Sequence, residues 1–234
     1  MIDLRDPVAS GTHLLTSVWA VFATILLWKL SRGDKLRNFS MTVFGCSMVV
    51  LYAASGLFHG LQLPRENLRL YQKIDQSAIY TLIAGTCTHI TLLLLTGWFR
   101  LFLFGGIWLM AAAGIFSMWL LPQVPHTVMV SIYLIMGWFG ILGMPRYYQL
   151  LGWRATRWAF LGTFFYTIGA VFELLRWPTL WPGVIRPHEV LHLCDMAGTG
   201  SFFIFVVRYV LPFKRMPLRS PDTSDDKSVQ TQAA

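Results

Sequence analysis

Long apolar runs, separated by short polar joints, dominate the pattern of hydrophobic and polar positions along the chain. A helix needs about 20 such residues to cross the hydrocarbon core of a membrane. The runs predict spans at residues 14–30, 40–61, 75–97, 99–121, 126–144, 157–175 and 188–212. Because the apolar residues are continuous and do not alternate over roughly ten-residue segments, a β-barrel is disfavoured. The pattern therefore predicts an all-α fold, a seven-transmembrane helix bundle.

Composition indicates the same lipid environment. The 234-residue chain is 55% hydrophobic and 13% charged, whereas a soluble domain carries about 25% charged residues. We expect an N-terminal segment at residues 1–13, a seven-helix transmembrane domain at 14–212 and a polar, disordered tail at 213–234. The acidic start "MIDLRDP" lacks the positive region of a signal peptide, so the first run is predicted to be a retained helix.

The basic residues are unequally distributed between the two faces that a seven-span topology creates. Six Lys and Arg residues fall on the face that holds the N-terminus and thirteen on the other face. The positive-inside rule therefore predicts a cytoplasmic C-terminus for a multi-pass protein of the cell (inner) membrane. No continuous basic patch with interleaved aromatic residues indicates a nucleic-acid partner, and membrane lipid is the partner that we expect.

Polar residues inside the predicted spans concentrate at one depth. His59 lies near the end of the second span, and His188 and His192 lie at the start of the seventh. The second span ends on the face where the seventh begins, because four whole spans separate them. Asp75, in "QKIDQSAIY", opens the third span on that same face. Three imidazoles and a carboxylate are therefore expected in one layer of the bundle, where polar groups are costly and typically functional.

This set of residues is suited to a metal ion. His188 and His192 share a helix face because they are four positions apart. Three neutral imidazoles with a fourth position open to water are a ligand set typical of catalytic zinc, which lowers the pKa of its water to about 7. Ser55, four positions before His59, is placed to orient the site or a bound water. We predict Zn2+ as the cofactor, with metal ligands His59, His188 and His192 and catalytic residues Asp75, as general base or outer partner of the water, and Ser55.

The H-x-x-x-H pair taken alone is also compatible with roles that involve no zinc. A proton relay, an interhelical hydrogen bond or a pair of haem ligands also uses membrane histidines. Haem favours single histidines that face each other across a bundle, not two on one helix face. The presence of His59 and Asp75 on the same face of the membrane makes metal binding the better interpretation. Among the remaining histidines, His13 is placed at a span entrance, His126 in a loop, and His89 deep in the third span as a satisfied polar side chain.

Two further acids have open assignments. Asp195 lies seven residues after His188, so it either supports the metal from outside the ligand set or pairs with a cation from a neighbouring helix. Glu173 lies near the end of the sixth span, three positions before Arg176. That spacing predicts a local ion pair at the membrane interface.

Taken together, the motifs resemble those of a known family. The stretches "SGLFH", "IDQSAIYTLIAGTCTH" and "PHEVLHL" are similar to the haemolysin III family, which belongs with the progestin and adipoQ receptors and, more distantly, the alkaline ceramidases. The resemblance extends from "DPVASGTH" to "FVVRYVLP", nearly the whole chain. It implies an adiponectin-receptor-like bundle in which His59, His188 and His192 bind zinc within the membrane. It also implies Asp75 near the zinc-bound water and Ser55 close by. Relatives in these groups are lipid receptors or hydrolases that release fatty acid from ceramide-like amides.

Two features depart from the pattern of the family. Asp195 stands in "HLCDMAG" where an apolar residue is expected, which predicts a more acidic site. The charge distribution places the N-terminus, and the metal site with it, on the outer face of the membrane. The adiponectin receptors, by contrast, keep their N-terminus in the cytoplasm.

Three functions remain open at this point. The first is an intramembrane zinc hydrolase, in which water activated by the metal and Asp75 attacks a lipid amide or ester while the apolar bundle holds the acyl chain. In the second, zinc is structural and the protein is a receptor-like or stress-response component that binds lipid without turnover. The third, a membrane-permeabilising cytolysin, is the least favoured, because uniformly apolar spans are typical of a stably integrated bundle. No residue pattern indicates the headgroup of a substrate or the oligomeric state.

Overall fold

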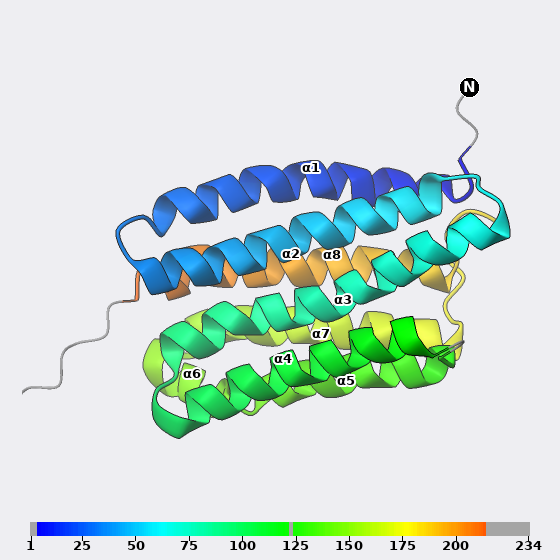
Figure 1. Cartoon of the computed structure of the whole chain (residues 1–234). Helices are drawn as coiled ribbons and strands as arrows, with labels where there is room; N and C mark the ends of the chain where they lie inside the picture. The colour runs from blue at the N-terminus through cyan, green and yellow to red at the C-terminus, as the bar shows by residue number, and fades with distance from the viewer. Residues whose placement is uncertain (1–3, 122–123, 214–234) are drawn as a thin grey trace, which may run out of the picture.

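A bundle of helices accounts for nearly all of residues 4–121 and 124–213, which the computed structural model describes. Within these residues the helices are α1 Pro7–Leu30, α2 Lys35–Gly60, α3 Arg65–Leu94, α4 Gly97–Leu120, α5 His126–Ile141, α6 Met144–Leu151, α7 Trp153–Leu175 and α8 Pro187–Phe205, followed by a π-helical turn at Val206–Val210. They run alongside one another, with α1 at one edge of the bundle and α4 and α5 at the other (Figure 1). The predicted all-α bundle is confirmed.

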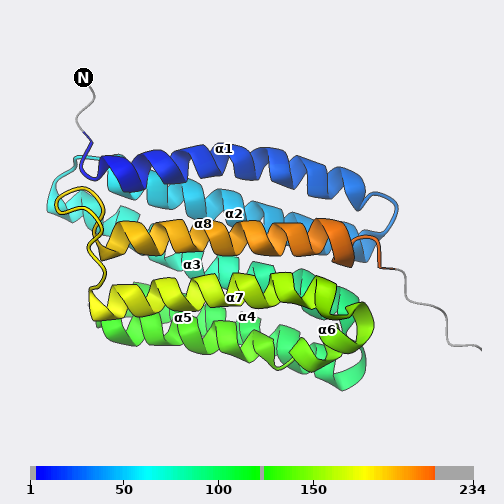
Figure 2. The ribbon, with the colours of Figure 1, turned by 180° about the vertical axis from the view of Figure 1, so that it is seen from behind.

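The order of the helices brings distant parts of the chain together at one end. Seen from behind, α8 lies between α1 and α7 (Figure 2). The start of α1, the end of α2 and the start of α8 share one end of the bundle, and the end of α8 lies at the other (Figures 1 and 2). The second and seventh predicted spans therefore meet at the same face, as the count of spans requires.

Membrane-length helices make up most of the described chain. Six helices are long and apolar enough to cross a membrane individually, namely α1, α2, α3, α4, α7 and α8 with its π-helical extension. The pair α5 and α6 passes the same test together, with a bend of 40° at the break between them, and supplies a seventh span if counted as one. The fifth predicted span, 126–144, therefore corresponds to a bent pair that continues to Leu151.

Several helices begin before the predicted spans. The first begins at Pro7 and not at residue 14, and α3 begins at Arg65 and not at residue 75. A proline at the first helical position is favourable because its missing N–H has no partner there in any helix, and polar first turns continue a helix into the membrane interface. Of the predicted tail at 213–234, only Phe213 is described, so that prediction lies outside the described residues.

Glycines let α7 and α8 approach closely. A Cβ atom added at Gly169 lies 2.7 Å from Cβ of Cys194, and one at Gly198 lies 2.7 Å from the Tyr166 ring. Small residues at such crossings permit the close packing that holds helices together in lipid. The contact fixes α8 against the end of α7, and both helices contribute to the site.

The outer surface of the bundle is strongly apolar. On α1, Leu15 is 74% exposed and Phe22 67%, and on α4, Leu120 is 78% exposed. Such a surface is unfavourable in water, where large contiguous apolar patches are rare. Lipid is the solvent that matches it.

Candidate metal centre

Three histidines from two helices converge at the end of the bundle where α1 begins. His59 lies in the last turn of α2, and His188 and His192 lie in the first two turns of α8. Nε2 of His188 lies 3.2 Å from Nε2 of His59 and 3.1 Å from Nε2 of His192. One ligand atom from each residue lies within 4.8 Å of the other two. The structure therefore brings together all three predicted metal ligands.

The spacing of the nitrogens is suited to a metal ion. Tetrahedral zinc holds imidazole nitrogens at about 2.0–2.1 Å, so two such ligands lie roughly 3.3 Å apart. The observed separations of 3.1 and 3.2 Å are close to that value. His59 and His192 are buried and His188 is half-buried, so the cluster is shielded from bulk water. The donor set and its spacing fit zinc.

The start of α8 is built to present its two histidines. Pro187 occupies the first helical position, where proline is favourable. The backbone N–H of Arg186 donates to Oε2 of Glu189 at 2.9 Å, and the Arg186 side chain donates to Oε1 at 3.2 Å. This cap satisfies polar groups at the helix start and fixes the turn that carries His188.

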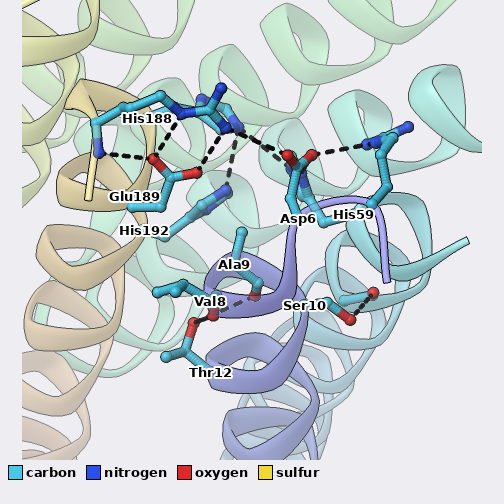
Figure 3. A network of polar contacts seen from close by, with 12 residues as sticks. Asp6, Val8, Ala9, Ser10, Thr12, His59, His188, Glu189 and His192 are labelled. Atoms are coloured by element: carbon cyan, nitrogen blue, oxygen red, sulfur yellow. Dashed lines mark hydrogen bonds and ion pairs between the residues drawn. The ribbon is translucent and has the colours of Figure 1, made fainter. Parts of the chain in front are cut away.

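An acid at the start of α1 contacts one of the three histidines. Oδ2 of Asp6 lies 3.1 Å from Nδ1 of His59, and Oδ1 accepts from the Arg186 guanidinium at 3.2 Å. Figure 3 shows Asp6 beside His59, with dashed lines that lead to the side chains of α8. Burial alone raises the pKa of Asp6, but hydrogen bonds with His59 and Arg5 outweigh burial and hold the pKa below its ordinary value. Asp6 thus faces two guanidinium groups and one imidazole.

A second acid contacts another of the three. Oε1 of Glu173, near the end of α7, lies 3.4 Å from Nδ1 of His188 and 3.3 Å from Nε2 of His126. The predicted local ion pair with Arg176 is wrong within the described residues. Arg176 instead caps α7 in a left-handed conformation, with φ 52° and ψ 40°, and Glu173 turns to the histidines of two other helices.

The predicted catalytic residues line the same cavity as the metal ligands. Ser55 lies one turn before His59 and is 1% exposed, and Asp75 on α3 is 7% exposed. Both line a cavity of about 440 Å³ that also contacts the three histidines. The Ser55 Oγ atom is buried, forms no hydrogen bond of ordinary geometry among the described residues, and has the Asp75 carboxyl group as a polar neighbour. The catalytic roles of both residues stay predictions.

Beyond the histidines and the acids, the cavity extends between α3, α5 and α7 with a mixed lining in which apolar side chains are accompanied by hydroxyl groups such as those of Thr86, Tyr133 and Tyr166. Its volume falls within the usual range of small-molecule sites, roughly 300–1,000 Å³. Its apolar lining includes Ile79, Leu82, Ile83, Met129, Leu134 and Trp138. The polar histidine layer therefore closes one end of a space that suits a hydrocarbon chain.

The remaining histidines differ in their relation to the site. His13 is 1% exposed and lines the cavity, with its ring centroid 4.1 Å from that of His192. The sequence analysis placed His13 only at a span entrance and did not predict its contact with His192. His126 begins α5 and contacts Glu173, so it is not a loop residue.

His89 packs against Phe44 and does not line the cavity. Its ring nitrogens form no hydrogen bond of ordinary geometry in the described chain, although the Gly85 backbone is a polar contact of the ring, so its role as a satisfied side chain stays a prediction.

Asp195 lines the cavity one turn beyond His192. Its carboxylate forms no ion pair within residues 4–121 and 124–213, so of its two predicted assignments the pairing with a neighbouring cation is not observed. An acid therefore faces the cavity, as the departure from the family pattern predicts.

Sequence reasoning did not place Asp6 and Glu173 at the site, although a signal was present. The count of spans that brought His59 and His188 to one face applies equally to the residue before the first span and to the end of the sixth. The same count thus identifies both acids as neighbours of the layer. The count of spans does not give the rotation of each helix about its own axis, and this rotation determines which side chains face the interior of the bundle.

Comparison with known proteins gives consistent matches. A family model described as "Haemolysin-III related" matches residues 4–203. Hemolysin-3 of Bacillus cereus is 31% identical over 212 residues, which cover 89% of this chain and 94% of that protein. The hemolysin-3 homolog of Bacillus subtilis (strain 168) is 29% identical over 209 residues, 88% of this chain and 93% of that protein. Every residue of the histidine cluster and its two acids lies inside the matched range.

Proposed function

The chain belongs to the haemolysin-III-related family and is a multi-pass integral membrane protein, and from this premise we propose that it is a zinc-dependent hydrolase of lipid amides or esters. The observation that carries the proposal is the convergence of three Nε2 atoms at the end of an apolar cavity. A metal with three protein ligands keeps a position for water or substrate. A cavity lined by apolar side chains supplies the place for an acyl chain.

In the proposed hydrolysis, each group of residues at the site has a separate role. His59, His188 and His192 hold the zinc ion, which when bound supplies the Lewis acidity that activates water and polarises a carbonyl group. Asp75, buried in the same cavity, accepts the proton of the attacking water and passes it to the leaving amine or alcohol as the C–N or C–O bond breaks. The buried hydroxyl of Ser55, beside Asp75, donates to or accepts from that water and orients it. The apolar walls exclude other water from the reacting carbonyl.

A structural zinc is the second candidate. It is favoured by the way the histidines tie the end of α2 to the start of α8. Removing a ligand that binds only the folded state lowers stability by about 2.7 kcal/mol when its concentration is 100 times Kd. A structural role therefore predicts a large loss of thermal stability with a zinc chelator and little effect of Asp75→Asn on any function.

The test is turnover of a panel of lipid amides and esters by the purified chain, with zinc content measured in the same samples. We expect Asp75→Asn to keep its zinc and to lose turnover by about 10²–10⁴-fold, which is the typical contribution of a general base. Glu66→Gln, at the exposed start of the same helix, is the matched control and should keep both. Full turnover by Asp75→Asn contradicts the proposed role.

We also propose that the C-terminus is cytoplasmic and that the metal centre faces the outer side of the inner membrane. The proposal rests on the excess of Lys and Arg on the face opposite the N-terminus. A C-terminal fusion to a reporter that is fluorescent only in the cytoplasm tests it. Fluorescence is expected, and activity of a periplasm-specific reporter at the same position contradicts the orientation.

A further inference from the structure

We propose that Asp6 and Glu173 are positioning residues that orient His59 and His188 toward the metal. The start of α1 is then part of the metal centre, although α1 supplies none of the predicted ligands. This inference rests on the metal site proposed above. It goes beyond that site because it assigns a role to two acids from helices that the ligand set does not include.

The contact of Asp6 determines which nitrogen of His59 is free. Asp6 also pairs with the guanidinium groups of Arg5 and Arg186 at 3.1 and 3.2 Å. A carboxylate paired in this way accepts hydrogen bonds, so Nδ1 of His59, 3.1 Å from Asp6 Oδ2, carries the proton. In a neutral imidazole the other nitrogen then has a lone pair. That nitrogen is Nε2, which faces His188 Nε2 at 3.2 Å. One edge of the ring is bound to the acid and the other is turned to the metal position.

Glu173 has the same relation to His188. Its Oε1 atom lies 3.4 Å from Nδ1 of His188, while Nε2 of His188 faces the cluster. Carboxylates that contact the outer nitrogen of a ligating histidine fix its tautomer and its orientation and raise its basicity. Two acids on two separate helices thus repeat one arrangement at two ligands.

The third ligand provides an internal contrast. Nδ1 of His192 is buried and has no hydrogen-bond partner within the described residues, and its ring packs against His13. No carboxylate fixes its tautomer in this part of the chain. Orientation by an acid is therefore specific to His59 and His188, and it is not a consequence of burial alone.

Asp6 is itself held in place from several directions. Its backbone N–H donates to the carbonyl oxygen of His59 at 2.9 Å, and Arg186 donates to its Oδ1 atom at 3.2 Å. These contacts join α1, α2 and α8, so the carboxylate has little freedom to leave the imidazole.

The test measures zinc affinity of the full chain in detergent by competition with a chelator of known affinity. Asp6→Asn and Glu173→Gln are each expected to weaken zinc binding by about 10–100-fold, the usual cost of losing an outer partner of a ligating histidine. Asp6→Glu, which retains a carboxylate, is expected to recover part of the loss. The ring ¹⁵N shifts of labelled histidines give a readout besides affinity, because only loss of the orienting contact changes the tautomer of His59.

Two controls separate orientation from general stability. Asp34→Asn removes an acid that caps α2 and pairs with Arg37 at the opposite end of the bundle. Ser10→Ala removes a contact between α1 and α2 without changing a carboxylate. Both are expected to keep the zinc affinity of the unaltered chain. Equal loss in Ser10→Ala and Asp6→Asn overturns the inference, because loosening of α1 then accounts for both.

The remaining outcomes are also decisive. If the unaltered chain binds zinc and both acid variants bind it equally well with unchanged histidine shifts, the inference is wrong and the proposed metal site stands. If the unaltered chain binds no zinc, the proposed function fails first and the inference fails with it.

Discussion

The Nε2 atoms of His59 and His188 lie 3.2 Å apart, although 129 positions separate the two residues in the chain. Two imidazole lone pairs at this distance repel unless a proton or a cation lies between them. With His192 the cluster has a third nitrogen of the same kind. A single metal ion would satisfy all three nitrogens, which a single shared proton cannot do.

Metal content gives the most direct test of this relationship. Elemental mass spectrometry of the purified chain is expected to find about one zinc per chain, and none in His188→Ala/His192→Ala, which removes two of the three ligands. The control is His126→Ala, which alters a histidine outside the cluster and should retain zinc. Zinc at equal levels in the double variant contradicts the assignment.

Replacement of His13 tests why an unpartnered imidazole is kept beside the ligands. Its two ring nitrogens are buried without hydrogen-bond partners in the described chain, and such groups cost roughly 1–3 kcal/mol. His13→Phe is therefore expected to raise the thermal midpoint and, because His13 lines the cavity, to lower turnover of the lipid panel.

The matched control for this change is His89→Phe. His89 is equally buried and forms no hydrogen bond of ordinary geometry among the described residues but lies outside the cavity. It should raise the midpoint without changing turnover. Equal turnover in the two variants shows that the cavity makes no use of His13, and a fall in the thermal midpoint with His13→Phe contradicts the cost assigned to its ring nitrogens.

Close packing of α7 on α8 gives a prediction on stability. Gly169→Ala places a Cβ atom 2.7 Å from Cβ of Cys194, which has no flexible side-chain end to move aside. We expect a loss of about 1–3 kcal/mol, typical of overpacking, measured as a lower thermal midpoint in detergent. Gly105→Ala, on α4 with no atom within 4 Å of the added Cβ, should be neutral or stabilising by up to about 1 kcal/mol. Equal midpoints in the two variants contradict this account of the crossing.

The part of the site that sequence predicts is the part set by spacing and by the count of spans. His188 and His192 share a face because four positions separate them, and His59 joins them because the number of spans between them is even. Asp75 and Ser55 reach the same cavity for the same reasons.

The part that sequence does not predict depends on which helices are neighbours and how each is rotated. His13 reaches His192 only because α1 packs beside α8, and an apolar run of uniform hydropathy gives no sign of its buried face. The bend between α5 and α6 is likewise absent from the hydropathy pattern, since both helices are apolar enough to be taken as one span.

The origin of the ligands in α2 and α8 has a consequence for synthesis. A ribosome completes His59 long before it reaches Pro187, so the nascent chain holds one ligand in the membrane while most of the bundle is still being made. If the proposed zinc site is correct, zinc loading must wait for insertion of the last span, and a chain released before that point carries no complete site. Metal binding would then mark a finished polypeptide and distinguish it from truncated products that share most of its helices.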